Sequence, residues 1–593
     1  MTFKPKFESL VDIYKHSTST FVDRPLFGEK KGGDWKWMSY GDFKNATDAF
    51  RAGLKDLGVE SGDRVAVISN NRPEWAIAAY ATYGSGACYV PMYEAMLNKD
   101  WKYILGDCEA KAVVVANESI RNRIQEFRSE LPKLEHVIVI DGEGNDDSTA
   151  WADVIQRGKD NPSEVANPTG EDLAGFIYTS GTTGNPKGVK LTHKNLAYNV
   201  SAVHDFFPMS EDDRSLSFLP WAHSFGQTCE LHGLFSMGAS MGIAEAVDKI
   251  IPNLAEIRPT LLFSVPRIFN KIYDGLNKRM AEEGGLKKSL FDAAMNNQNL
   301  RKELAGKGRS SGWADFKHKL LDKLVFSKVR ERFGGRLKYA FSGGAAISKQ
   351  VAEFIDNLGI TVYEGYGLTE TSPIATANYP GNRKIGSIGK PIPGVTVTID
   401  KEVTGDDVNG EIVIHGHNIM AGYHNLPEEN KKVFTEDGGF RTGDMGRMDD
   451  EGFVYITGRI KEQYKLENGK YVVPSPLEEL LKLSPYIANV LVFGDNKPFN
   501  VAIVVPDLEV LGQWGSEHGV SDEKLLTDPA VEKLIAQELE QHSDQFKQFE
   551  KVRKFKLIPD DFTTENGMLT PSLKVKRRIV INAYDDELNS LYG

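Results

Sequence analysis

The chain has 593 residues, of which 40% are hydrophobic and 26% are charged, a composition typical of a soluble globular protein. One hydrophobic core rarely serves this length, so we expect about three or four domain-sized units. The formal net charge is −12 and no strongly basic domain stands out, which argues against general nucleic-acid binding.

The cysteines and the apolar segments of the sequence indicate in which cellular compartment to expect the protein. The cysteines at 88, 108 and 229 form neither a Cys-x-x-Cys pair nor a disulfide framework, which favours a reducing cytoplasm. The residues Met1–Leu10 contain no apolar segment of a secretory signal. No run of about 18 uncharged apolar residues occurs, so we expect no transmembrane span. Peripheral contact with the inner face of a membrane stays open, as does a homodimer.

The first 140 residues alternate between helical and strand patterns. An amphipathic helix is expected over Thr47–Leu57, which stops at Gly58, and a further helix over Pro73–Thr82, which has proline in its first turn. Three short apolar runs are typical of buried parallel strands: Val65–Ser69, Ala112–Ala116 and His136–Ile140. This alternation predicts an α/β sheet with helices on both faces.

A loop rich in glycine and hydroxyl groups follows the apolar run Leu173–Tyr178, which predicts a buried strand. Hydroxyl and backbone N–H groups donate to phosphate oxygens, glycine permits their close approach, and Lys187 adds positive charge for the outer phosphates. A Walker loop continues into a helix, whereas here Val189–Thr192 predicts a strand. A Gly/Thr-rich surface turn is the alternative, but such a turn rarely needs so many hydroxyls and a lysine.

Two later regions differ in character from the first half. The charge-rich helical stretch from residue 281 to 332 predicts a solvated insertion, with a basic membrane-facing surface as the alternative. Alternating patterns over Val395–Ile399 and Glu411–Ile414 predict a β-rich subdomain.

A separate small α+β unit is expected after Gly458. Ala488–Phe493 and Asn500–Val505 predict a pair of strands, and Pro529–Phe549 predicts a helical region. The fold class is therefore α/β, with a large N-terminal domain of α/β subdomains plus a β-rich subdomain, and a small C-terminal α+β domain.

Several segments carry the residue types that a nucleotide site needs. The side-chain-poor backbone of Gly343-Gly344-Ala345 allows a purine ring to lie close. Tyr366 offers a ring for stacking, Thr369 a hydroxyl for a phosphate, and Glu370 a carboxylate that can hold Mg²⁺ together with phosphate oxygens.

Two more side chains extend this set. The Asp444 carboxylate can accept hydrogen bonds from two ribose hydroxyls, and the Arg459 guanidinium suits a phosphate or a ribose. Each short motif is weak alone; a lone Thr-Gly-Asp, for example, is more often a capped turn.

Together and in this order, from about Asp172 to Ile579, the motifs resemble those of the adenylate-forming superfamily of acyl-CoA synthetases, peptide-synthetase adenylation domains and luciferases. Within it, the stretches Phe218–Ser224, Ser264–Tyr273 and Arg332–Ala345, with the helical insertion, are most similar to long-chain fatty acyl-CoA synthetases.

The resemblance implies an AMP-forming long-chain fatty acid–CoA ligase with ATP, Mg²⁺ and coenzyme A. A carboxylate attacks the α-phosphate of ATP and releases pyrophosphate, and the CoA thiol then attacks the acyl-adenylate. It implies that residues 1–460 form the adenylation domain, which binds ATP and the acyl group, and that residues 461–593 form a mobile domain with the catalytic lysine.

Residue roles are implied in the same way. Glu370 and Thr182 would face the metal, and His223 would orient the acyl carboxylate. The segment after His223 contains apolar residues that suit either an acyl tunnel or ordinary core, and Gln227 occupies the position of an aromatic gate, so no gate is assigned. The implied ATP- and AMP-binding residues are Thr179, Ser180, Gly181, Thr182, Thr183, Gly184, Lys187, Gly343, Gly344, Ala345, Glu364, Gly365, Tyr366, Gly367, Leu368, Thr369, Asp444 and Arg459.

The C-terminal motifs complete the implied mechanism. Aligning Lys-Val-Lys-Arg-Arg with the family pattern Lys-x-x-Arg-Arg places the catalytic lysine at Lys574 instead of Lys576. Lys461 matches the hinge position, and Lys465 with the Gly469 region would serve thioester formation after the domain swings.

Two alternatives remain beside the ligase. One is a fatty acyl-AMP ligase that passes its adenylate to a carrier protein, because its hinge and core motifs would look alike. The other is a catalytically silent nucleotide or lipid binder, which the presence of the full set of charged site residues disfavours.

Overall fold

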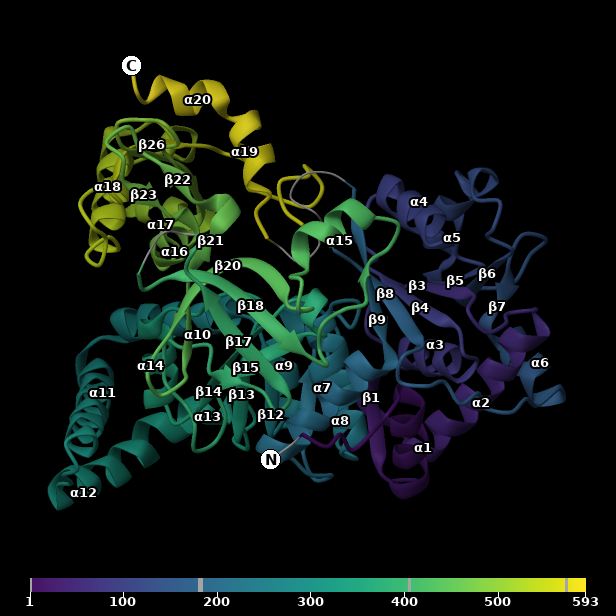
Figure 1. Ribbon diagram of the computed structural model, residues 1–593. Coiled ribbons are helices and arrows are strands. Elements are labelled where there is room, and N and C mark those ends of the chain that lie inside the picture. Colours follow the sequence, from purple (N-terminus) through teal and green to yellow (C-terminus); the bar gives the residue numbers. More distant parts are fainter. Residues whose placement is uncertain (1–2, 180–184, 404–406, 571–573) are drawn as a thin grey trace. The chain divides into compact units, whose positions relative to one another are not determined.

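The computed structural model describes residues 3–179, 185–403, 407–570 and 574–593. The chain forms two units (Figure 1). The large unit comprises residues 1–269, 279–397 and 414–440, and the C-terminal unit comprises 270–278, 398–413 and 441–593. We describe each unit by itself.

The large unit contains an eight-stranded sheet in the order β19-β9-β8-β4-β3-β5-β6-β7. The strands are β3 (Arg64–Ile68), β4 (Cys88–Met92), β5 (Ala112–Asn117), β6 (His136–Asp141), β7 (Thr149–Ala150), β8 (Leu173–Thr179), β9 (Lys187–Thr192) and β19 (Gly422–Tyr423). The strands from β8 to β7 are parallel, whereas β9 is antiparallel to both β8 and β19. The predicted buried parallel strands are thus present.

A second sheet of the large unit has nine strands in the order β16-β15-β14-β13-β12-β10-β11-β1-β2. They are β1 (Pro25–Lys31), β2 (Asp34–Ser39), β10 (Arg214–Ser217), β11 (Ser240–Ile243), β12 (Leu261–Ser264), β13 (Tyr339–Ser342), β14 (Val362–Gly367), β15 (Ile374–Ala377) and β16 (Lys390–Pro391). Because β12, β13 and β14 are parallel neighbours, the segments that follow them emerge at one edge of the sheet.

Helices with apolar faces pack on these sheets. They include α1 (Leu10–Thr20), α2 (Tyr40–Asp56), α3 (Pro73–Gly84), α7 (His193–Phe206), the π-helix η2 (Phe225–His232) and α8 (Gly233–Ser236). The helix α2 is longer at its start than its pattern predicts, because Ser39 and Asp42 form a capping box there. Every residue of α3 except Glu74 is buried, so this helix runs through the core.

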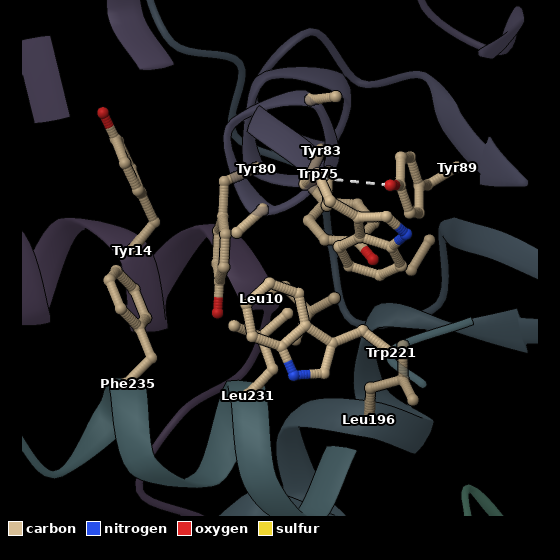
Figure 2. Close-up of a cluster of buried hydrophobic side chains, with 14 of the residues drawn as sticks. Leu10, Tyr14, Trp75, Tyr80, Tyr83, Tyr89, Leu196, Trp221, Leu231 and Phe235 are labelled. Atoms are coloured by element: carbon tan, nitrogen blue, oxygen red, sulfur yellow. Dashed lines mark hydrogen bonds between the residues drawn. The ribbon is translucent and has the colours of Figure 1, made fainter. Parts of the chain in front are cut away.

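Aromatic side chains fill the core between α3 and the segment from Trp221 to Phe235 (Figure 2). The Tyr80 ring lies 4.7 Å from that of Phe235, and the Trp75 ring lies 5.7 Å from that of Trp221, centroid to centroid. The Tyr89 hydroxyl donates to the Trp75 carbonyl at 3.2 Å. Leu231, Leu234 and Phe235 are fully buried in this cluster, so ordinary core packing accounts for them.

The C-terminal unit contains most of a four-stranded sheet in the order β17-β18-β20-β21. These strands are β17 (Val395–Asp400), β18 (Gly410–Gly416), β20 (Phe440–Met448) and β21 (Val454–Arg459). A three-stranded sheet follows, β24 (Ile487–Phe493), β25 (Asn500–Pro506) and β26 (Val552–Leu557), in which β24 and β25 form the predicted pair and run antiparallel. The helix α18 (Pro529–Gln541) ends earlier than the predicted helical region.

The α/β class, with a large N-terminal part and a separate α+β C-terminal part, is confirmed. No helix within the described ranges is long and apolar enough to cross a membrane.

Candidate nucleotide-binding site

The hydroxyl-rich loop joins two antiparallel strands of the eight-stranded sheet. Thr179, the last residue of β8, pairs with Lys187, the first residue of β9. The strand predicted after the loop is therefore present, and α7 begins only at His193. Five loop residues with expected roles lie outside the described residues: Ser180, Gly181, Thr182, Thr183 and Gly184.

Lys187 is held by a carboxylate that the sequence did not single out. Its Nζ lies 2.7 Å from Oε2 of Glu429, which belongs to the short helix α15 (Pro427–Val433). The other oxygen, Oε1, accepts from Lys432 at 2.7 Å. The hydrogen bond from Lys187, followed by that from Lys432, lowers the pKa of Glu429 to about 2. Glu429 thus forms an ion pair with Lys187, as a phosphate oxygen would.

Tyr423 connects this ion pair to Glu370. It lies on β19, beside Val189 of β9, and its ring centroid is 5.1 Å from the Lys187 Nζ. Its hydroxyl donates to Oε1 of Glu370 at 2.7 Å. Burial and the neighbouring Glu370 charge raise the pKa of Tyr423, so it stays a donor. One strand pairing therefore brings the loop lysine and the expected metal ligand into the same cluster (Figure 1 shows β8, β9 and α15).

The segments after β13 and β14 lie next to the loop that carries His223. An added Cβ at Gly343 would come 3.1 Å from the Phe225 ring, and Gly344 has a φ of +81° that favours glycine. The Ser224 hydroxyl lies 3.3 Å from that of Thr369. The structure thus groups residues 343–345, Thr369 and the His223 loop around one edge of the nine-stranded sheet.

His223 is half-buried and has a defined tautomer when neutral. The backbone N–H of Phe225 donates to its Nδ1 at 3.2 Å, so the ring proton lies on Nε2. This places an N–H donor on the far side of the ring, as orientation of an acyl carboxylate requires.

The segment from Glu364 to Thr369 is tightly packed. Gly386 N–H donates to Oε2 of Glu364 at 3.3 Å, and burial raises the pKa of that carboxyl to about 7. An added Cβ at Gly367 would come 1.6 Å from the Pro373 carbonyl oxygen, so only glycine suits this position. Gly365 lies opposite Ala377, Tyr366 is buried, and the Leu368 N–H donates to the Thr371 hydroxyl at 2.8 Å.

The C-terminal unit places Asp444 and Arg459 side by side. They pair across β20 and β21, and Nε of Arg459 lies 3.1 Å from Oδ1 of Asp444. Asp444 is almost fully buried, while 41% of the Arg459 side chain is exposed. A buried carboxylate beside a half-exposed guanidinium can recognise adjacent hydroxyls and an anion.

The three lysines with expected catalytic or hinge roles are all exposed. Lys461 lies in the 3₁₀ turn Ile460–Glu462, directly after Arg459. Lys465 pairs with Tyr471 in a two-stranded sheet, and its Nζ is 5.5 Å from the Tyr471 ring centroid. The backbone at Lys574 is held by Thr570, whose N–H donates to the Lys574 carbonyl at 2.8 Å.

Sequence reasoning missed Tyr423 and Glu429. The only signal at Glu429 is a helix start, with proline at 427 followed by two acidic residues that favour the N-terminus of a helix. Glu429 lies 242 residues from Lys187 along the chain, so no local motif joins them.

The cluster suits ATP with a divalent cation. Glu370 uses one carboxylate oxygen toward Tyr423, and the carboxylate is a ligand type that Mg²⁺ prefers. Within the described part of the chain, no three His, Cys, Asp or Glu side chains gather as a metal site.

The chain belongs to the AMP-binding enzyme family. Residues 14–424 match the family model described as AMP-binding enzyme, and residues 461–593 match the AMP-binding enzyme C-terminal domain. The resemblance drawn from the motifs is confirmed.

The long-chain-fatty-acid–CoA ligase FadD15 of Mycobacterium tuberculosis is 34% identical to this chain, and the alignment covers 98% of this chain and 96% of FadD15. The peroxisomal long chain acyl-CoA synthetase 7 of Arabidopsis thaliana is 31% identical, and the alignment covers 99% of this chain and 87% of the synthetase. The fold is similar to the A domain of a carboxylic acid reductase from Segniliparus rugosus, solved with AMP and a carboxylic acid. That comparison has a TM-score of 0.77, 24% identity, and coverage of 99% of this chain and 94% of the other.

Proposed function

We propose that this protein is an AMP-forming ligase that joins a long-chain fatty acid to coenzyme A through an acyl-adenylate. The observation that carries the proposal is the cluster of Lys187, Tyr423 and Glu370, in which the lysine at the start of β9 and a carboxylate contact the same tyrosine. Full-length similarity to long-chain-fatty-acid–CoA ligases supports the choice of substrates. The enzyme thus acts in fatty acid metabolism.

In the first step, the carboxylate attacks the α-phosphate and pyrophosphate leaves. Several negative groups converge, so the protein must stabilise charge. Lys187 and residues 179–184 hold the outer phosphates, and Lys574 stabilises the charge that develops at the α-phosphate. Mg²⁺ bound by Glu370 would supply further positive charge to the polyphosphate.

Other residues position the acyl carboxylate and the nucleotide. His223 donates from Nε2 to the acyl carboxylate. The backbone of 343–345 and the Tyr366 ring receive the adenine, Thr369 donates to a phosphate, and Asp444 with Arg459 receives the ribose.

In the second step, the CoA thiol attacks the acyl-adenylate and AMP leaves. We place the domain boundary at residue 460, with residues 461–593 turning about Lys461 so that Lys465 replaces Lys574 near the reacting atoms. One site then serves both reactions in turn.

A panel of carboxylic acids tests the proposal. The purified chain is incubated with ATP, Mg²⁺, CoA and acids from acetate to very long chains, including aromatic acids. Acyl-CoA, AMP and pyrophosphate should form in equal amounts, most rapidly with a long-chain acid such as palmitate.

Two outcomes would replace the proposal. Accumulation of acyl-AMP without acyl-CoA, despite added CoA, would identify a fatty acyl-AMP ligase. Failure of pyrophosphate exchange with every acid would identify a silent nucleotide or lipid binder.

The compartment is part of the same proposal. We place the protein in the cytoplasm, because Cys88, Cys108 and Cys229 are buried free thiols, as a reducing compartment allows.

A further inference from the structure

The helix α12 (Gly312–Leu321) presents an apolar stripe to solvent. It continues through the π-helical turn η4 (Asp322–Phe326) into α13 (Ser327–Glu331), so residues 312–331 are helical throughout. Four large apolar side chains are strongly exposed: Trp313 by 73%, Phe316 by 62%, Leu320 by 53% and Leu324 by 44%. Their spacing of three, four and four residues puts them on one helix face.

Other side chains of this helix fix it to the large unit. Ala314, Leu321 and Phe326 are buried, and Asn297 of α11 (Gly285–Gly306) donates to the Ala314 carbonyl at 3.0 Å. Arg301 of α11 lies 2.8 Å from Asp315. Figure 1 shows α11 and α12 as neighbouring teal helices. The apolar stripe is therefore part of an ordered, anchored element.

The stripe carries aromatic residues at its start. The Trp313 and Phe316 rings are nearly parallel, with centroids 6.0 Å apart and an interplanar angle of 25°. The Trp313 ring, which is apolar but carries one N–H donor, favours the level of lipid headgroups, and the Phe316 ring adds apolar surface beside it. An apolar face of this kind is costly in water, so it requires a partner.

Basic side chains surround the stripe. Residues 301–332 contain ten Lys and Arg against four Asp and Glu, although the whole chain has a net charge of −12. Three of those four acids are already engaged: Glu303 with Lys307, Asp315 with Arg301 and Asp322 with Arg330. The exposed Lys319, Lys323 and Lys328 thus leave this surface positive.

We propose that the 312–331 helix docks the enzyme on an anionic lipid surface, with Trp313, Phe316, Leu320 and Leu324 inserted among the headgroups and the flanking lysines over lipid phosphates. A rigid amphipathic helix with a basic polar face is suited to lying in the plane of a bilayer interface. The site goes beyond ligase activity, because it recognises a membrane and not a reactant.

A second copy of the chain is a poorer occupant of this face. Two identical stripes packed together would bring the lysines of both copies side by side, and like charges oppose such an interface. Lipid phosphates carry the complementary charge.

Vesicle flotation tests the proposal without any activity assay. The wild-type chain is mixed with vesicles of phosphatidylcholine alone or with 30% phosphatidylglycerol. We expect binding to the anionic vesicles, weak binding to the neutral ones, and weakening by 0.5 M salt. The variant Trp313→Ser/Phe316→Ser should lower partition by at least about tenfold. The triple variant Lys319→Gln/Lys323→Gln/Lys328→Gln should lower partition onto the anionic vesicles by about fivefold for each lysine removed.

Matched variants separate this face from general surface effects. Val247→Ser removes a side chain that is 81% exposed elsewhere, and Lys55→Gln/Lys159→Gln/Lys349→Gln removes three exposed lysines of the same unit. Both should float as the wild type does.

Three results would overturn the proposal. They are absence of wild-type binding to anionic vesicles, unchanged binding by the apolar double variant, and loss of a dimer in that variant without any vesicle binding. Circular dichroism and CoA ligation of a water-soluble acid report folding and the proposed activity separately, so a failure of the ligase assignment would not be mistaken for a failure of docking.

Discussion

The Lys187 cluster of the large unit and the lysine-bearing region of the C-terminal unit are built differently. In the former, Lys187, Glu370 and Glu429 are partly sheltered and tied through Tyr423 within one unit. In the latter, Lys461, Lys465 and Lys574 are exposed. The first arrangement provides fixed electrostatics, whereas the second suits side chains that a domain movement delivers. Binding and delivery are thus separable by mutation.

Replacing Lys574, which the proposed domain movement brings to the reacting atoms, should have the largest effect on activity. Lys574→Ala should slow acyl-adenylate formation by about 10³-fold, because the charge developing at the α-phosphate loses its cation. Thioester formation from supplied acyl-adenylate should continue. Pyrophosphate exchange and a CoA assay with synthetic acyl-adenylate measure the two half-reactions.

Lys576→Ala is the matched control for that assignment. If Lys576→Ala abolishes adenylation and Lys574→Ala does not, the alignment of the motif is wrong by two residues. Survival of both half-reactions in Lys574→Ala would remove the lysine from the mechanism.

Removing the metal-ligand carboxylate tests the fixed region. Glu370→Gln should slow adenylation by about 10²-fold and raise the Mg²⁺ concentration needed for half-maximal rate. Tyr423→Phe keeps the carboxylate and loses only the 2.7 Å hydrogen bond, so its effect should be smaller. An unchanged Mg²⁺ dependence in Glu370→Gln would contradict the proposed role.

Two buried acids, one from each unit, have different hydrogen-bond partners. Glu478 of the C-terminal unit accepts from Arg577 at 2.5 and 2.6 Å. Glu230, fully buried on η2, accepts hydrogen bonds from the neutral Ser215 and Ser217 hydroxyls at 2.7 and 2.9 Å. Burial, partly offset by these hydrogen bonds, raises the pKa of Glu230 to about 8.

This difference predicts a pH effect on stability. Between an unfolded pKa of about 4.5 and the folded value, the folded chain holds a proton on Glu230 that the unfolded chain releases. Stability should therefore fall as pH rises through this window, by about 1.4 kcal/mol per pH unit. Glu230→Gln should lose this slope in urea unfolding between pH 6 and 7.5, whereas the exposed Glu428→Gln should keep it. Equal slopes in the wild type and Glu230→Gln would show that Glu230 is ionised in the fold.

The sequence predicted what lies close along the chain. The strands on either side of the hydroxyl-rich loop and the α/β alternation follow from local patterns. Tyr423, Glu429 and Glu230 could not be found in this way, because strand pairing and burial give them their roles. The 312–331 helix was predicted as a solvated insertion from its charges, whereas the structure separates those charges from an exposed apolar face.

The smallest predicted effect concerns the contact between Lys187 and Glu429. A phosphate must displace the Glu429 carboxylate to gain Lys187, so the ion pair opposes nucleotide binding. Glu429→Gln should lower the KM for ATP and the inhibition constant of pyrophosphate by up to about fivefold, the range of a partly exposed ion pair. Steady-state kinetics with varied ATP and pyrophosphate measure both.

Two neighbouring variants fix the sign of this effect. Lys432→Met removes the second cation on Glu429 and should strengthen its hold on Lys187, so the KM for ATP should rise. Glu428→Gln, whose carboxylate pairs with Lys431, should leave both constants unchanged. A rise in KM for Glu429→Gln would mean that Glu429 orients Lys187 for the phosphates instead of competing with them. Lys187 would then already be oriented for ATP, and no phosphate would need to displace Glu429 from it.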